Sequence, residues 1–352
     1  MTGNRLLLVG CYTHDSPTGI HVYDASDAAG TLVATGRVDG LEHPSFLAAH
    51  PNGGIVYAVS ETVPDGAVVA LRLDPADGSL TRFDHAPSHG AAPCHVSVDP
   101  AGRHVYVANY GSGTVAAYAI ALDGGFGELI AVHRHAGSGP HARQAGPHAH
   151  CIVPNPDGNG VYAVDLGTDR ISHYRHDSPD AFRLAEEVAL DPGTGPRHLA
   201  FHPRAPVAYA VGELDSTIIT LAVDRDDGRL RPRFVASTLP DGHTGESIGA
   251  EVRVHPTGRH VYVSNRGHDS IAVFGFAGPD QPLEPVGHVP SGGRTPRNFA
   301  VHPAGRTLVV ANQDSGTLVA FAVDEHTGLL RRNGVVAEVS EPVCVTFVEV
   351  DR

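Results

Sequence analysis

Hydrophobic and polar positions alternate along almost the whole chain. Short runs of β-branched and aromatic residues, such as 45–49, 114–118 and 198–201, are interrupted by Gly, Asp or Pro. Runs of this length and composition predict β-strands bounded by turns. No long stretch follows the 3.6-residue period of an amphipathic helix. The pattern therefore predicts an all-β chain.

One unit recurs along the sequence. It contains an apolar run, a Pro anchor with a Gly-containing turn, a second run that usually carries a Tyr, and two further runs. The anchors are Pro51, Pro100, Pro156, Pro203, Pro256 and Pro303. Their separation of about 50 residues is typical of a four-stranded antiparallel propeller blade, and the common helical repeats are shorter.

The two ends of the chain supply one more blade. Residues 6–12 match the second strand of the unit and 18–23 match the third, whereas 342–347 match the first strand. We therefore expect a seven-bladed β-propeller with residues 1–352 as a single domain. Pairing of the N- and C-terminal strands in one blade would close the ring and remove exposed sheet edges.

Composition narrows the choice of partners and location. Gly (41 residues) and Pro (27) fit a turn-rich β-protein, and the net charge of −14 argues against nucleic acid and anionic membranes as partners. No apolar run is long enough to span a membrane. Four widely spaced cysteines, without a CxxC motif, favour a reducing, cytoplasmic location. We expect a monomer or a small homo-oligomer.

Equivalent positions of the repeat should form rings, because the first strand of each blade lines the channel. Six residues before each anchor, and at the matching position near the C-terminus, stand Ser45, Cys94, His150, Arg197, Ala250, Arg297 and Val343. Ten residues after the anchors stand Glu61, Tyr110, Leu166, Glu213, Arg266 and Gln313. Since consecutive strands run antiparallel, both rings should face the same mouth of the channel.

A functional site should break the repeat, and five charged or imidazole side chains do so: His150, Arg197, Glu213, Arg266 and Arg297. The arginines could instead form salt bridges between blades, with Glu213 only neutralising Arg197. Recurring residues have a structural interpretation: the His-Pro histidines would cap turns or pack between blades, and the recurring Asn and Asp would hold turns. The histidine residues in question are His50, His202, His255 and His302.

The pair His148 and His150 has the spacing that places two imidazoles on one face of a strand. A metal site would need a third ligand, and none is evident, so we expect neither a metal nor another cofactor.

Several segments resemble the seven-bladed lactonase family, namely 93–100, 146–150, 165–167, 195–198, 212–214, 263–267 and 296–298. That family includes propeller-type 6-phosphogluconolactonases and a fungal carboxy-muconate cyclase. The resemblance implies an active site formed by His148 or His150 with Arg197, Glu213 and Arg266. Gly212 departs from the pattern, which leads us to expect a polar residue, often Asn, at that position.

The resemblance implies a lactone hydrolase acting on a small anionic sugar lactone, with 6-phospho-D-glucono-1,5-lactone as the favoured substrate. A δ-lactone is an activated ester, so a base for water and a cation for the oxyanion can suffice. We assign the base to His150 or Glu213, with His148 beside them, and the oxyanion to Arg197.

The remaining candidates would bind substrate. Arg266 and Arg297 suit a phosphate, and Glu61 and Tyr110 stand in the same ring as Arg266. Two alternatives stay open. A carboxy-muconate-type cyclase could use the same groups, and a non-catalytic propeller could bind partners, although Trp-Asp repeat signatures are missing. No Gly-x-Ser-x-Gly elbow is present, which argues against a serine hydrolase. Because these are rim positions, we expect their substitution to leave folding intact.

Overall fold

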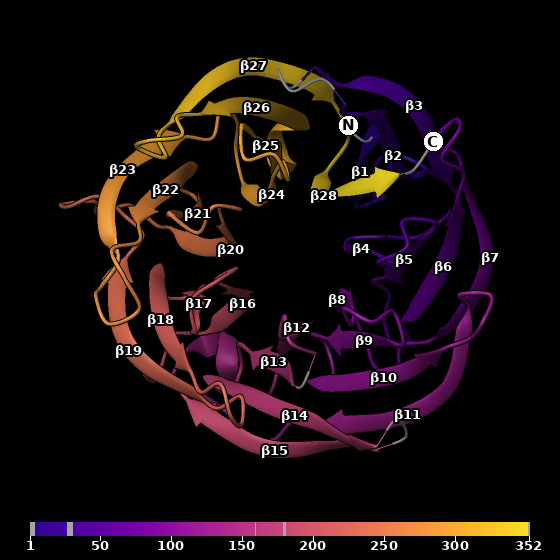
Figure 1. Cartoon of the computed structure of the whole chain (residues 1–352), viewed down its shortest axis with the longest axis horizontal. Helices are drawn as coiled ribbons and strands as arrows, with labels where there is room; N and C mark the ends of the chain where they lie inside the picture. Colours follow the sequence, from indigo (N-terminus) through magenta and orange to yellow (C-terminus); the bar gives the residue numbers. More distant parts are fainter. Residues whose placement is uncertain (1–3, 27–30, 159, 179–180, 351–352) are drawn as a thin grey trace.

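A computed structural model describes residues 4–26, 31–158, 160–178 and 181–350, which form seven four-stranded antiparallel sheets around a common axis (Figure 1). The inner strands are β4 (Leu47–Ala49), β8 (Pro93–Val98), β12 (Ala149–Pro154), β16 (Pro196–Phe201), β20 (Ile248–Val254), β24 (Pro296–Val301) and β28 (Pro342–Val350). The second strands are β5 (Ile55–Ser60), β9 (His104–Asn109), β13 (Val161–Asp165), β17 (Val207–Gly212), β21 (His260–Arg266), β25 (Thr307–Asn312) and β1 (Asn4–Cys11).

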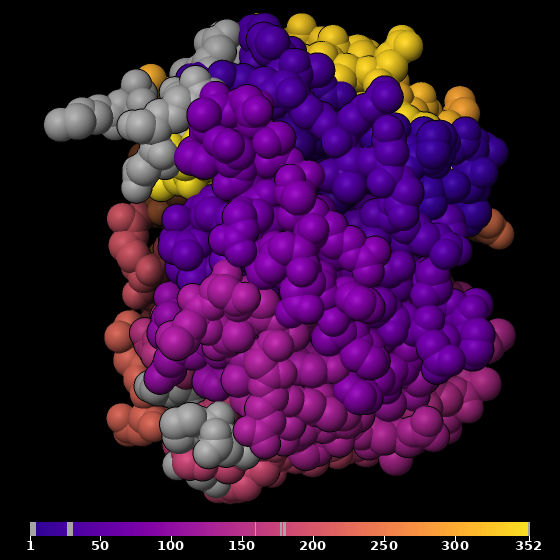
Figure 2. Space-filling model, turned by 90° about the vertical axis from the view of Figure 1, so that its right-hand side faces the viewer, coloured from indigo at the N-terminus to yellow at the C-terminus, as the bar shows by residue number. Residues whose placement is uncertain are grey.

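The two outer layers complete each blade. The third strands are β6 (Ala67–Leu73), β10 (Thr114–Ile120), β14 (Arg170–Ser178), β18 (Thr217–Val223), β22 (Ser270–Gly275), β26 (Thr317–Val323) and β2 (Thr18–Asp24). The outermost strands are β7 (Leu80–Pro87), β11 (Phe126–Arg134), β15 (Ala181–Ala189), β19 (Leu230–Ser237), β23 (Glu284–Pro290), β27 (Leu330–Glu338) and β3 (Val33–Asp39). Figure 2 shows the wall of the ring, where the N-terminal blades, coloured indigo to magenta, lie side by side.

Helices are almost absent from the described residues. Two single-turn 3-10 helices, η1 (Ala142–Gln144) and η2 (Gln313–Ser315), lie in loops. In the part of the chain that the structure describes, no helix is long and apolar enough to cross a membrane. The all-β prediction is confirmed.

The ring closes through the chain ends, as predicted. Strand β28 pairs antiparallel with β1, with Val345 opposite Val9 and Phe347 opposite Leu7, so the order of the closing blade is β28-β1-β2-β3. The first and last strands lie together in Figure 1. No covalent turn joins these two strands, so ring closure depends on their hydrogen bonds and packing.

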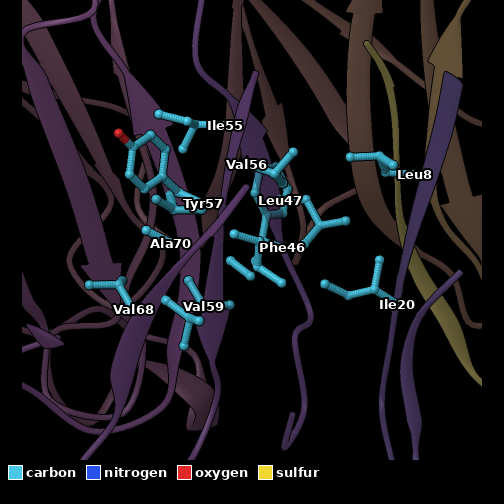
Figure 3. Packing of buried hydrophobic residues seen from close by; sticks show 14 of the residues in the cluster. Leu8, Ile20, Phe46, Leu47, Ile55, Val56, Tyr57, Val59, Val68 and Ala70 are labelled. Atoms are coloured by element: carbon cyan, nitrogen blue, oxygen red, sulfur yellow. The ribbon is translucent and has the colours of Figure 1, made fainter. Parts of the chain in front are cut away.

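Buried tyrosines of several second strands link their blade to the next. The hydroxyl of Tyr57 donates to the carbonyl of Gly124 at 2.8 Å, and that of Tyr262 donates to Gly328 at 3.0 Å. A ring with one polar end can fill an apolar interface if its hydroxyl finds an acceptor. Figure 3 shows Tyr57 packed with Ile55 and Val59 in the apolar layer that continues toward Leu8 of the closing blade.

Three of the four His-Pro histidines, namely His50, His202 and His255, contact a carbonyl of the next blade and form a latch at the rim that carries the Pro turns, in agreement with a structural role. The Nε2 atom of His202 is 2.9 Å from the carbonyl of Gly258, and that of His255 is 2.8 Å from the carbonyl of Gly305. His302 precedes the closing blade, where β28 and β1 are the ends of the chain. Its buried Nε2 has no hydrogen-bond partner among the described residues.

Candidate active site

The inner strands begin with an irregularity that aims side chains into one mouth of the channel. In β16, Pro196 pairs with Gly212 and His198 with Val211, so Arg197 is the extra residue of a β-bulge. The residues at the same point of the other bulged strands are Cys94, His150, Arg297 and Val343. Bulges commonly redirect side chains beside active sites. The predicted inner ring therefore consists largely of bulge residues.

Both predicted rings meet at this mouth. A cavity of about 170 Å³ is lined by Glu61, Cys94, Tyr110, Arg143, His150, Glu213, Arg266 and Arg297. A narrower hollow adjoins it and is lined by Ser45, Phe46, Glu61, Cys94, His150, Arg197, His198, Arg297, Asn298 and Val343. A larger cavity of about 420 Å³ lies among turn residues such as His202 and Asp224 and shares no lining residue with this mouth.

Glu213 is the most heavily paired carboxylate of the site. Its Oε1 is 2.6 Å from Nη1 of Arg143, and its Oε2 is 2.9 Å from both Nε of Arg197 and Nη2 of Arg266. Burial alone would raise the pKa of Glu213, but the three guanidinium groups lower it to about 2. Such a carboxylate is a weak base, and its position suits it to holding arginines in place.

A hydrogen-bonded network below the mouth fixes Arg197. Its Nη1 donates to the carbonyl of Ala250 at 2.8 Å and lies 3.3 Å from Nε2 of His198. The Nδ1 atom of His198 is in turn 3.0 Å from Oε2 of Glu251. The Nε of Arg197 is at ion-pair distance from Glu213 but is not aligned for a hydrogen bond. His198 and Glu251 were not predicted as members of this network.

The other arginines approach from different sides. Arg266 donates from Nη2 to the carbonyl of Gly249 at 3.1 Å. Arg297 donates from Nη2 to the hydroxyl of Tyr12 at 2.9 Å, and its guanidinium carbon lies 5.4 Å from the centre of that ring. With Arg143 and Arg197, four guanidinium groups line the two hollows, against the carboxyl groups of Glu61 and Glu213. The mouth is therefore positive even when both acids are ionised.

His150 lines both hollows as a neutral imidazole. Burial lowers its pKa well below the usual value, and the nearby guanidinium groups of Arg197, Arg297 and Arg266 lower it further. Its buried Nδ1 finds no hydrogen-bond partner among the residues that the structure describes. A neutral imidazole keeps one nitrogen lone pair, which can accept a proton.

His148 lies outside both hollows. Its Nδ1 is 2.8 Å from the carbonyl of Tyr110, and the two rings stack at 4.4 Å. Tyr110 lines the cavity, and its hydroxyl accepts a hydrogen bond from Nη2 of Arg143 at 3.3 Å. The structure thus separates the His-x-His pair, with His150 at the cavity and His148 supporting the rim. In the described part of the chain, no group of three or more His, Cys, Asp or Glu residues could hold a metal ion.

Three observations correct or extend the sequence interpretation. The side chains of Arg197 and Glu213 are only 3% and 2% exposed, so these two residues are buried and are not the exposed rim positions that we expected. Arg143 and Tyr12 join the site although they were not predicted there. A side chain at Gly212 would meet the carboxylate of Asp215, which occupies the space beside this glycine.

Comparisons with known proteins agree with this architecture. The profile of the family described as "Lactonase, 7-bladed beta-propeller" matches residues 6–347. A 6-phosphogluconolactonase of Bacillus subtilis (strain 168) is 36% identical over 340 residues, which are 97% of each chain. A structure described as the periplasmic gluconolactonase PpgL of Pseudomonas aeruginosa superimposes with a TM-score of 0.92 at 32% identity, covering 98% of this chain and 99% of the other.

Proposed function

The chain belongs to the seven-bladed β-propeller lactonase family and is a lactone hydrolase, and we propose that its substrate is 6-phospho-D-glucono-1,5-lactone. The observation that carries this proposal is the excess of guanidinium groups around a cavity of about 170 Å³. Guanidinium groups bind phosphate through paired hydrogen bonds, and a buried positive mouth favours an anionic substrate over a neutral one. The name of the Bacillus subtilis relative supports the same substrate.

We assign the attack on the lactone to water activated by His150. The neutral imidazole takes a proton from water as the oxygen adds to the carbonyl carbon. Arg197 stabilises the negative charge that develops on the carbonyl oxygen, because it is held in place before the reaction. Glu213 stays ionised and positions Arg143, Arg197 and Arg266.

The substrate also improves the base. Without ligand, burial and then the surrounding arginines weaken His150 as a base by favouring its neutral form. A bound phosphate adds negative charge to the mouth and offsets that effect, so the pKa of His150 should rise in the complex. Arg266 and Arg297, assisted by Arg143 at the edge, are the groups that we assign to the phosphate.

A second substrate is favoured by one comparison. The Pseudomonas aeruginosa structure carries the name gluconolactonase, which makes free glucono-1,5-lactone the rival. The cyclase alternative remains a matter for assay, because the same arginines suit a carboxylated muconate. Family membership favours an enzyme over a non-catalytic binding propeller.

The test measures lactone opening by the purified protein with phosphorylated lactone, free lactone and a carboxylated muconolactone. The readout is the proton that each reaction releases. We expect the highest kcat/KM for the phosphorylated lactone, and Arg297→Ala should remove most of that preference. Equal kcat/KM for phosphorylated and free lactone would contradict the substrate assignment. A protein that processes only the muconolactone would be a cyclase.

We further propose that residues 1–352 act as one domain in the cytoplasm, as a monomer or small homo-oligomer. The four cysteines, all buried and free, support a reducing compartment. Size-exclusion chromatography with light scattering and cell fractionation test these points.

A further inference from the structure

Two carboxyl groups stand at the same point of the repeat on different sides of the mouth. Glu61 follows β5 as Glu213 follows β17, and both line the cavity of about 170 Å³. Two blades lie between the blade of Glu61 and the blade of Glu213 in one direction around the ring, and three lie between them in the other direction. A ligand in the cavity therefore lies between the two acids.

The surroundings of the two acids are opposite in kind. Glu213 has three guanidinium partners. Glu61 is held by hydroxyl groups: Ser45 donates to its Oε2, and Tyr12 donates to the same oxygen at 3.2 Å. Among the described residues, no Arg or His forms an ion pair with Glu61. Nothing at its partners requires the carboxyl to be ionised.

The two oxygens of Glu61 also differ. Oε2 accepts both hydroxyl groups, whereas Oε1 has only a long contact of 3.4 Å with the Tyr12 hydroxyl. Oε1 is thus the oxygen that is available to carry a proton. Glu61 borders the catalytic cavity, the narrow hollow beside His150, and a third cavity of about 430 Å³ at Tyr12 and His43.

We propose that Glu61 is the general acid of the reaction and protonates the ring oxygen when the lactone opens. This inference rests on the proposed function. The ring oxygen of a sugar lactone would otherwise leave as an alkoxide, which is a poor leaving group, and a positioned acid removes that cost. Ser45 and Tyr12 are the positioning residues, because both donate to Oε2 and only the long Tyr12 contact reaches Oε1.

The step balances with water as the only co-reactant. Water adds to the carbonyl carbon and His150 takes its proton, giving a tetrahedral intermediate whose charge Arg197 faces. The bond between that carbon and the ring oxygen then breaks, and the proton of Glu61 moves to the ring oxygen. The proton on His150 returns to Glu61 through solvent, so both groups regain their starting states and one hydroxy acid is released.

The charges around Glu61 are compatible with this role. Burial raises the pKa of Glu61, whereas Arg297, Ser45, Tyr12 and His43, which face it from three segments of the chain, lower it by a smaller amount. Burial also raises the pKa of Tyr12 to about 12, so Tyr12 stays a hydroxyl donor. Two acids in one site whose environments push their pKa values apart are the usual basis for dividing acid and base roles.

The experiment compares wild type with Glu61→Gln and Glu61→Asp on the best lactone substrate over pH 5 to 9. Wild-type kcat should fall as pH rises through the pKa of Glu61, since only the protonated acid donates. Glu61→Gln should lower kcat by about a hundredfold or more, with a smaller change in KM, and should abolish this basic limb. Glu61→Asp should recover part of kcat and retain the limb.

The matched control is Glu42→Gln, which makes the same change in a residue that borders the third cavity but not the catalytic one. It should leave kcat and the pH profile unchanged. Thermal melting of each variant shows that the comparison concerns folded protein. The inference is overturned if Glu61→Gln keeps kcat within threefold or keeps the basic limb, or if wild type has no such limb. Wild type that hydrolyses no lactone would instead overturn the proposed function.

Discussion

Arg143 reaches from the short helix η1 to Glu213, with 2.6 Å between Nη1 and Oε1. The two residues differ sharply in environment, because the side chain of Arg143 is 40% exposed whereas that of Glu213 is 2% exposed. Arg197 and Arg266 approach the same carboxylate from the interior, with exposures of 3% and 11%. Arg143 is therefore the arginine of this cluster that a substrate can displace or recruit at the lowest cost in free energy.

Loss of Arg143 should affect binding more than folding. In Arg143→Ala we expect KM for the phosphorylated lactone to rise about tenfold, since one charge-assisted hydrogen bond is lost. Kinetics at constant ionic strength measure this. The free energy of unfolding should change by about 1 kcal/mol or less, because Glu213 keeps two arginines and Arg143 is exposed. Arg170→Ala, which removes an exposed partner of Glu187, is the control and should change neither quantity.

The ionised Glu213 should make the fold sensitive to acid. Its pKa of about 2 in the folded protein lies below the usual 4.5, so its contribution to stability is complete above pH 4.5 and disappears as pH falls toward 2. The shift corresponds to roughly 3 kcal/mol. Glu213→Gln should be less stable than wild type by that order at pH 7, and the difference should shrink by pH 3.

Urea unfolding at the two pH values measures this difference. Glu349→Gln serves as the control, because it removes an exposed carboxylate that pairs with Arg5. A Glu213→Gln protein as stable as wild type at pH 7 would show that the arginine cluster does not depend on this carboxylate.

The His-Pro latches allow a paired test at one repeat position. His255→Ala removes the hydrogen bond to Gly305, whereas His302→Ala removes a ring whose Nε2 has no partner in the described structure. Both variants lose a buried imidazole that accepts a backbone N–H at Nδ1, so the difference reports the latch together with the contact of His255 to the Thr257 hydroxyl. We expect His255→Ala to be the more destabilised by about 1 kcal/mol in thermal or denaturant unfolding. The reverse order would contradict the latch.

The repeat made much of the site predictable. His150, Arg197 and Arg297 stand at equivalent positions of the repeat. The propeller topology alone therefore predicted that they lie at the same mouth of the channel. His198 and Glu251 were missed because strand alternation places neighbours on opposite faces, and the bulges in β16 and β20 break that alternation. Local bulge geometry has no clear signal in one sequence.

Arg143 and Tyr12 were missed for another reason. Arg143 lies in a loop without a counterpart in the other blades. Tyr12 directly follows β1 as Tyr110 follows β9, but no Pro anchor precedes it, so the spacing from the anchors did not reach it. Periodicity finds members of a ring but not side chains that reach the ring from irregular segments. Glu61 was placed in the correct ring, yet its two hydroxyl partners come from an inner-strand start in its own blade, Ser45, and from the closing blade, Tyr12.

The noncovalent pairing of β1 with β28 makes the site depend on the last strand of the ring. Without β28, the closing blade would consist of β1, β2 and β3 alone. Tyr12, which contacts both Glu61 and Arg297, sits beside that pairing. A chain that lacks β28 should therefore be inactive even though the strands of the other six blades are all present.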